Sequence, residues 1–158
     1  MCAALAAVIP FLMFSCNKSD NPDAIMSVQW YPIELHIYVQ DKDSVDLLNY
    51  DSVYYVGNDF TLTYGGKTYR VETKYTDEDP ELVLLIDNAK RKYCAYFGEL
   101  DGSKEYDTDF ILNWRDGSRD TIHFTRKITD FATSEDTWLL NGSDTGQKTY
   151  IGEFLLTK

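Results

Sequence analysis

Basic residues, histidines and cysteines are scarce in this sequence, and each scarcity excludes a class of function. Lysine and arginine together number 15 against 26 acidic residues, so the formal net charge is −11 at pH 7. A nucleic-acid partner needs basic side chains to displace the counterions of its phosphates, and we therefore expect none. The two histidines, His36 and His123, lie in strand-like runs opposite the aliphatic residues, as solvent-facing side chains do. The sequence also lacks the G-x-S-x-G motif of a nucleophile elbow, and we predict a protein that is not an enzyme and needs no cofactor.

Long apolar runs are missing as well. Residues 1–15 carry no charge and are almost wholly apolar over 3–14, but a bilayer-spanning helix needs about 20 residues and Pro10 interrupts the run. A short apolar run that ends at small residues and continues into polar chain is typical of an export signal. The alternative is a buried N-terminal strand with an incidental cysteine.

Residues 13–16, Met-Phe-Ser-Cys, resemble the lipobox of bacterial lipoproteins. In that family the cysteine thiol takes diacylglycerol, the peptide is cut just before the cysteine, and the new amine is acylated. The resemblance implies a lipoprotein signal peptide over 1–16 that is removed before Cys16, acyl chains on Cys16 that enter the lipid bilayer, and a flexible polar tether over 17–28. Asn17 is not the aspartate that signals inner-membrane retention, and the tether is similar to those of surface-displayed Bacteroidetes lipoproteins. We therefore expect a lipid-anchored protein of the cell outer membrane, with display at the cell surface left open.

The cysteines do not form a disulfide framework. With Cys2 in the signal and Cys16 carrying lipid, only Cys94 remains, so we expect no intramolecular disulfide. Cys94 lies in the strand-like run 93–97, where we expect a buried and inert thiol.

Aromatic residues are plentiful, at 15% of the chain, and they favour the half-buried surfaces of β-sheets. Aliphatic residues alternate with polar ones over 33–40, which predicts a strand with one buried face. Two alternating runs flank Gly65 and Gly66, and this pattern predicts a β-hairpin over 59–73 with a type I′ turn. The sequence therefore favours β structure both in its composition and in its local pattern.

Further strand signals follow down to the end of the chain. Gly117 suits the left-handed position of a second tight turn. The run 82–86 fits either a helix opened by Pro80 or a buried strand, and its shortness favours the strand. About nine short strands with regular turn signals predict one all-β domain over 29–158, an antiparallel β-sandwich of two sheets with an immunoglobulin-like fold.

Two blocks of this domain resemble short uncharacterised lipoproteins of Bacteroidetes. The first block joins residues 30–33 to Val39, Asp41 and 46–49, and the second joins 96–102 to 111–122. These lipoproteins usually carry glycine in place of Arg115. The turn Trp-x-Asp-Gly-Ser at 114–118 is also similar to the hairpin of PKD-type immunoglobulin-like domains. The resemblance implies an envelope address and a β fold, and it implies no activity.

Two acidic loops are candidate calcium sites. Asp41, Asp43 and Asp46 form the first, and the run 77–81 forms the second. Ca²⁺ takes six to eight oxygen ligands, often from spaced carboxylates, but this spacing lacks the glycine and the distal glutamate of an EF-hand. A solvated turn is therefore the favoured interpretation, and we predict no metal site.

The aromatic residues are the candidate ligand-binding groups. Trp30, Trp138 and several tyrosines are candidates for a flat platform on which sugar rings stack, and packing in the core is the competing interpretation. We expect a binding or structural module of the cell envelope that interacts with another envelope protein, with polysaccharide as the alternative partner. The C-terminal run 150–156 is a candidate edge strand for strand addition by a partner.

Overall fold

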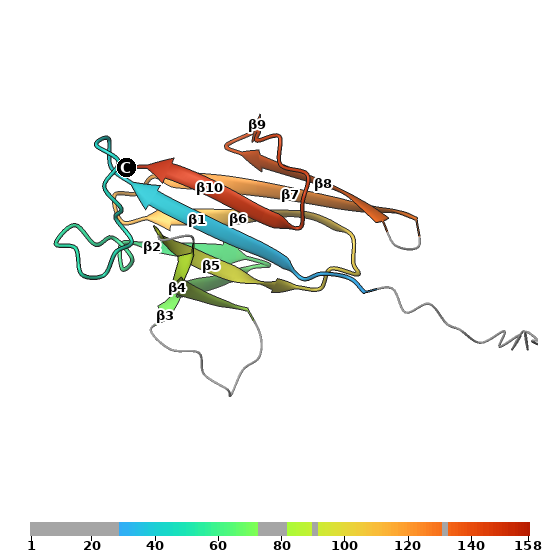
Figure 1. The fold of residues 1–158 in the computed structure, drawn as a ribbon, viewed down its shortest axis with the longest axis horizontal. Coiled ribbons are helices and arrows are strands. Elements are labelled where there is room, and N and C mark those ends of the chain that lie inside the picture. The colour runs from blue at the N-terminus through green and yellow to red at the C-terminus, as the bar shows by residue number, and fades with distance from the viewer. Residues whose placement is uncertain (1–28, 73–81, 90–91, 131–132) are drawn as a thin grey trace, which may run out of the picture.

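A computed structural model describes residues 29–72, 82–89, 92–130 and 133–158 (Figure 1). The predicted signal peptide, Cys16, the tether over 17–28 and the acidic run 77–81 lie outside the described residues, and they stay predictions. The described residues form no helix that would be long and apolar enough to cross a membrane. They form ten strands: β1 (Ile33–Gln40), β2 (Phe60–Tyr64), β3 (Lys67–Glu72), β4 (Val83–Ala89), β5 (Lys92–Leu100), β6 (Tyr106–Trp114), β7 (Arg119–Asp130), β8 (Thr133–Leu140), β9 (Ser143–Asp144) and β10 (Ile151–Thr157).

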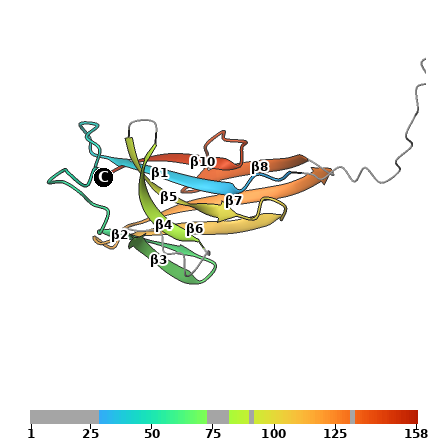
Figure 2. The ribbon, with the colours of Figure 1, turned by 60° about the horizontal axis from the view of Figure 1, so that its bottom comes forward.

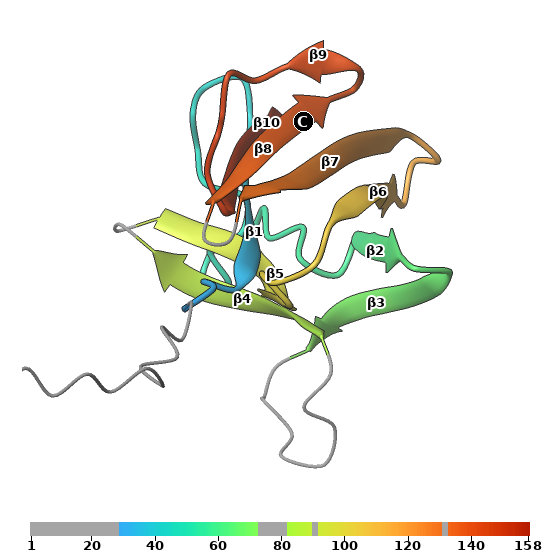
Figure 3. The same ribbon diagram turned by 90° about the vertical axis from the view of Figure 1, so that its right-hand side faces the viewer.

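All ten strands belong to one sheet, in the order β10-β1-β5-β4-β3-β2-β6-β7-β8-β9. The sheet curls into a half-barrel, which Figure 3 shows in side view. The predicted all-β class is confirmed, but the sheet does not divide cleanly into two antiparallel layers. The curled sheet has two arms, β10-β1-β5-β4 and β3-β2-β6-β7-β8-β9. Strand β3 joins them because it pairs with β2 on one side and, through Val71 and Glu72, with β4 on the other. Two of the pairs, β1–β10 and β3–β4, are parallel, which the sequence pattern did not indicate.

Local sequence explains the strands that were predicted most directly. In β1 the side chains of Ile33, Leu35, Ile37 and Val39 are at most 2% exposed, and the polar residues between them are half-buried on the other face. The predicted hairpin is confirmed as β2 and β3 around Gly65 and Gly66. Both glycines have positive φ angles, +57° and +79°, which a type I′ turn requires at its two central positions.

Three further predictions are confirmed. Residues 83–86 of the ambiguous run 82–86 lie in β4 and Leu82 directly precedes it, so the run is a strand rather than a helix. Gly117 has a φ of +86° in the turn between β6 and β7. Cys94 is buried.

Aromatic side chains from the two arms of the curl pack against each other in the core. The ring of Trp138 on β8 lies 5.7 Å from that of Phe154 on β10, between centroids. Gly152 on β10 allows this approach, because a Cβ there would lie 2.8 Å from the Phe154 ring and 3.0 Å from the Trp138 indole. Near the middle of the sheet, the rings of Phe97 on β5 and Phe110 on β6 lie 6.0 Å apart. The inner faces of the two arms therefore form one continuous core.

The two ends of the molecule differ in what they carry. Figures 1 and 2 show the start of β1 at one end, and the loop over 41–59 together with the C-terminus at the opposite end. Ile33 pairs with Leu100, so the connection from β5 to β6 lies at the end where the described chain begins.

Candidate functional site: a tyrosine-lined groove

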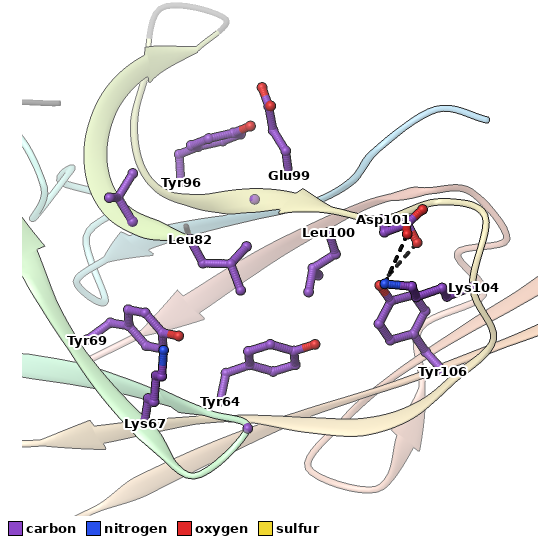
Figure 4. A pocket seen from close by; sticks show the side chains of 13 residues that line it. Tyr64, Lys67, Tyr69, Leu82, Tyr96, Glu99, Leu100, Asp101, Lys104 and Tyr106 are labelled. Atoms are coloured by element: carbon purple, nitrogen blue, oxygen red, sulfur yellow. Dashed lines mark hydrogen bonds and ion pairs between the residues drawn. The ribbon is translucent and has the colours of Figure 1, made fainter. Parts of the chain in front are cut away.

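An open groove of about 490 Å³ lies between the β2–β3 hairpin, the start of β4, the end of β5 and the start of β6 (Figure 4). Its volume falls within the range of about 300–1,000 Å³ that is usual for small-molecule sites. The rings of Tyr64, Tyr69 and Tyr106 lie along one side, and Leu82 and Leu100 lie on the other. The groove thus combines phenol rings with a short aliphatic wall.

Two of the tyrosines are held in place by the core beneath them. Tyr64 stacks on Phe110 with ring centroids 4.9 Å apart and an interplanar angle of 11°. Tyr69 meets Phe97 edge-on at 4.9 Å. Both tyrosines are half-buried, so the core fixes one part of each ring and the rest faces the groove. Such side chains offer an apolar face and a polar tip at low cost in conformational entropy.

The phenol groups of the groove are close enough to influence one another. Burial raises the pKa of Tyr64, and the neighbouring hydroxyls of Tyr106 and Tyr69 raise it further, while the Lys104 ammonium opposes them. Burial also raises the pKa of Tyr106, whose hydroxyl donates a hydrogen bond of 3.0 Å to the carbonyl oxygen of Asp101. Tyr64 and Tyr106 are therefore neutral at physiological pH, when each hydroxyl acts as both donor and acceptor.

An ion pair closes one end of the groove. The Lys104 Nζ lies 3.1 Å from Oδ2 of Asp101, and Oδ1 of Asp101 accepts hydrogen bonds from the backbone N–H and the hydroxyl of Ser103. These donors and the nearby ammonium lower the pKa of Asp101 to about 2. The loop itself is fixed from below, because Nη1 of the buried Arg126 donates a 2.8 Å hydrogen bond to the carbonyl oxygen of Gly102. The backbone of this loop and the Asp101 carboxylate are thus held by hydrogen bonds at the charged end of the groove.

A β-bulge forms the rim of the groove on β5. Glu34 pairs with Gly98 whereas the preceding residue, Ile33, pairs with Leu100, so Glu99 is the extra residue of the bulge. Bulges re-aim side chains and are frequent beside functional sites. Figure 4 shows the Glu99 side chain next to the Tyr96 ring at this rim. A Cβ on Gly98 would lie 2.8 Å from the Tyr96 hydroxyl, so glycine leaves room for the tyrosine to fold over the strand.

The tryptophans proposed as a sugar platform do not form one. Trp138 has 0% exposure, since its ring packs on Phe124 at 4.1 Å and its indole N–H donates to the carbonyl oxygen of Thr149 at 2.9 Å. Trp138 therefore packs in the core, which was the competing interpretation, and it offers no exposed face on which a sugar ring could stack. Trp30 is half-buried at the beginning of the described chain and does not line the groove.

The acidic loop at 41–46 uses its carboxylates to hold the backbone. Oδ1 of Asp41 accepts the N–H groups of Asp43 and Val45, each at 2.8 Å. Asp46 accepts the N–H groups of Leu48 and Tyr93, each at 2.9 Å. Within the described ranges, no three histidine, cysteine, aspartate or glutamate side chains gather closely enough to hold a metal ion. The arrangement is that of a turn stabilised by its own side chains.

The C-terminal strand β10 is the outermost strand next to β1, as an edge strand must be. Its free side is partly covered, because the Gln147 amide donates to the carbonyl oxygen of Glu153 and accepts its N–H, both at 2.7 Å. A partner that adds a strand here would have to displace Gln147. The edge is therefore a less accessible docking site than the sequence alone indicated.

Sequence reasoning did not identify the groove. Tyr64 follows Phe60 and Leu62 in strict alternation, which predicts another core residue, and nothing local links it to Leu82 or Asp101. One signal was present, since Asp-Gly-Ser occurs twice, at 101–103 and 116–118. Both copies form a turn in which the aspartate accepts the N–H of the serine, and only the first lines the groove.

No protein-family model matches the sequence, and comparison with curated proteins and with solved structures gives no match. The function must therefore be inferred from the side chains of the chain itself.

Proposed function

We propose that the protein is a non-catalytic, lipid-anchored binding protein of the bacterial outer membrane whose tyrosine-lined groove binds polysaccharide. The observation that carries the proposal is the row of Tyr64, Tyr69 and Tyr106 along a groove of about 490 Å³. Sugar rings present flat C–H faces that pack on aromatic rings, and their hydroxyls exchange hydrogen bonds with phenol groups. The three tyrosines offer both kinds of contact in one place.

The absence of catalysis is part of the proposal and is supported by the chemistry of the groove. General acid or base catalysis needs a group with a pKa near the working pH. Asp101 has a pKa of about 2 and is bound by Ser103 and Lys104, so it is a poor base at neutral pH. Cys94, a potential nucleophile, is buried in β5.

Affinity electrophoresis tests the proposed ligand. The purified protein is run in native gels that contain one soluble polysaccharide each, and retardation measures binding. Tyr69→Ala should weaken binding about fivefold or more, because an aromatic contact of about 1 kcal/mol is lost. Tyr54→Ala is the matched control, since Tyr54 is 66% exposed in the loop over 41–59, which lies at the other end of the molecule. Equal retardation of both variants, or none with any polysaccharide, would contradict the groove as a glycan site.

The lipid anchor is proposed from the sequence around Cys16, which resembles a lipobox. Cells that express the protein are labelled with a palmitate analogue and compared with cells that express Cys16→Ala. Label should appear on the parent protein in the outer-membrane fraction and be lost from the variant. Label that persists on Cys16→Ala would exclude this anchor.

An envelope protein as partner is a second candidate, and one surface favours it. The loop over 41–59 exposes Tyr50, Val53 and Tyr54 by 63%, 91% and 66%, at the end of the molecule opposite the start of β1. Apolar side chains presented together in this way are typical of protein contacts. A photo-crosslinking residue at position 53 should trap one protein in intact cells, and Val53→Asp introduced with the probe at position 54 should abolish the product. A product unaffected by the aspartate would count against this surface.

We also propose that the curled sheet is an immunoglobulin-like β-sandwich whose two layers are joined through β3. The packing of Trp138 against Phe154 across the core supports two facing layers. An experimental structure in which β3 leaves β4 and the layers separate would agree with the sandwich, and a closed barrel would exclude it.

A further inference from the structure

We propose that the ligand of the groove is a neutral polysaccharide and that the Asp101–Lys104 pair is the polar contact that orients one of its sugar units. This inference rests on the proposed function and adds the chemical class of the ligand and the residues that select it.

The charge of the groove favours a neutral ligand. Four charged side chains line it, and Lys67 and Lys104 balance Glu99 and Asp101. The whole chain carries a formal net charge of −11. A polysaccharide rich in carboxylates or sulfates would meet this negative field without a surplus of cations in the groove to compensate for it. A neutral sugar chain meets no such repulsion.

The Asp101–Lys104 pair has the hydrogen-bonding capacity that neighbouring sugar hydroxyls require. The ammonium of Lys104 donates only, the carboxylate of Asp101 accepts only, and a hydroxyl does both. Oδ1 of Asp101 is already occupied by two bonds from Ser103, whereas Oδ2 contacts only the Lys104 Nζ among the described residues. One hydroxyl of a sugar can donate to Oδ2 while its neighbour accepts from Lys104. The side chains remain reachable, with 46% of Asp101 and 68% of Lys104 exposed.

Hydrogen bonds hold the loop backbone that carries the pair, although both of its side chains are exposed. Exposed pairs contribute little to folding and are usually mobile. Here the loop between β5 and β6 is fixed by Arg126, which bonds the carbonyl oxygen of Gly102, and by Tyr106, which bonds that of Asp101. A polar contact fixed before the ligand arrives loses less entropy on binding. The pair therefore adds selectivity at the end of the tyrosine row.

The second Asp-Gly-Ser turn provides a matched control. Asp116 accepts the N–H of Ser118 at 2.8 Å, as Asp101 accepts that of Ser103, and hydrogen bonds from the serine lower the pKa of both carboxyls. The two turns lie at opposite ends of β6, and Asp116 does not line the groove. Asp101→Asn and Asp116→Asn therefore make the same chemical change to the same kind of turn at two places.

The test measures dissociation constants by affinity electrophoresis against a panel of neutral polysaccharides (dextran, mannan, galactan, β-glucan) and acidic ones (polygalacturonate, alginate). The protein should bind at least one neutral member and no acidic one. Asp101→Asn should raise the dissociation constant about tenfold, because a charge-assisted hydrogen bond is lost, and Asp116→Asn should leave it unchanged. Lys104→Met, which keeps an unbranched apolar side chain and removes the ammonium donors, should raise it similarly. Melting temperatures of all variants identify any loss that comes from unfolding.

Each outcome decides one level of the proposal. If only acidic polysaccharides bind, or if folded Asp101→Asn and Lys104→Met bind a neutral polysaccharide as the parent does, this inference is wrong and the glycan function stands. If the folded parent binds no member of the panel, the proposed function fails and this inference fails with it.

Discussion

Replacing Asp136 with leucine should destabilise the domain strongly, because Asp136 pairs with the buried Arg126 that holds the loop at the end of the groove. Arg126 on β7 and Asp136 on β8 face each other across the sheet and form two parallel bonds, Nε to Oδ1 at 2.7 Å and Nη2 to Oδ2 at 2.6 Å. Their side chains are only 3% and 5% exposed. In Asp136→Leu the guanidinium stays buried without its counter-charge, and only the bond from Nη1 to the carbonyl oxygen of Gly102 remains.

The magnitude follows from this burial. Removal of one partner of a buried ion pair costs about 3–5 kcal/mol, because the other charge is left uncompensated. A domain of this size has a total stability of about 5–15 kcal/mol. At about 3–5 °C for each kcal/mol, the melting temperature should fall by roughly 9–25 °C.

The double variant Arg126→Met/Asp136→Leu separates charge burial from loss of packing. With both charges removed, no buried charge is left, so the remaining loss should be about 1–3 kcal/mol from the carbonyl oxygen of Gly102, which loses its donor. Urea unfolding of the parent, both single variants and the double variant closes the cycle. A double variant as unstable as the sum of the singles would refute the reasoning, and so would an Asp136→Leu melting temperature within about 3 °C of the parent.

Three further predictions concern other parts of the fold. Gly152→Ala should cost about 1–3 kcal/mol in urea unfolding, because its Cβ would press on Trp138 and the Phe154 ring; a neutral result would mean that β10 moves away freely. Gly66→Ala should cost about 1 kcal/mol, since φ is +79° there, and circular dichroism melts that match the parent would contradict the type I′ turn. The Asp120 carboxylate should stabilise the fold at pH values above 3.8, its ordinary pKa. This stabilisation should be lost as the pH falls through the lower pKa that Asp120 has in the folded state. Burial opposes that lowering, but bonds from Lys158, Asn141 and Trp114 outweigh it. Asp120→Asn should therefore flatten the loss of stability below about pH 4 in urea titrations, and an unchanged slope would exclude this role.

Much of the strand pattern could be predicted because its causes are local. Alternation over β1 and the paired glycines at the β2–β3 turn each act within a few residues, so the sequence carries the information directly. The strand at 82–86 was also predicted, since a short apolar run cannot complete enough helical turns to compete. The sequence left Trp138 open between a sugar platform and the core, because burial depends on what lies opposite a strand, and Phe154 and Gly152 come from another strand, β10.

The sheet order and the groove could not be predicted, because they depend on pairs formed between distant segments. Among the described residues, the parallel contact of β3 with β4 involves two residue pairs, too few to leave a pattern in the sequence. Tyr64, Leu82 and Asp101 come from three separate elements and meet only once the sheet has curled. No periodicity links them, and each taken alone fits an ordinary strand or turn.

The location of the groove follows from strand register. Strand β4 begins at Val83 opposite Gly98, so within the described residues the last part of β5 has no partner on that side. The first part of β3 pairs with β2 alone, because its contact with β4 starts at Val71. The sheet therefore opens between these strand ends, and the apolar core would be exposed to water there unless large side chains covered it.

Tyrosine suits this position better than phenylalanine because its ring covers the core while its hydroxyl stays hydrated. A row of phenol groups is thus the expected lining of such an opening, and the selectivity that we propose for the groove depends on the short loop at its end. That loop is tightly constrained, since a Cβ on Gly102 would lie 1.9 Å from the carbonyl oxygen of Tyr31. Glycine at position 102 therefore allows the loop to place the Asp101–Lys104 pair at the end of the tyrosine row.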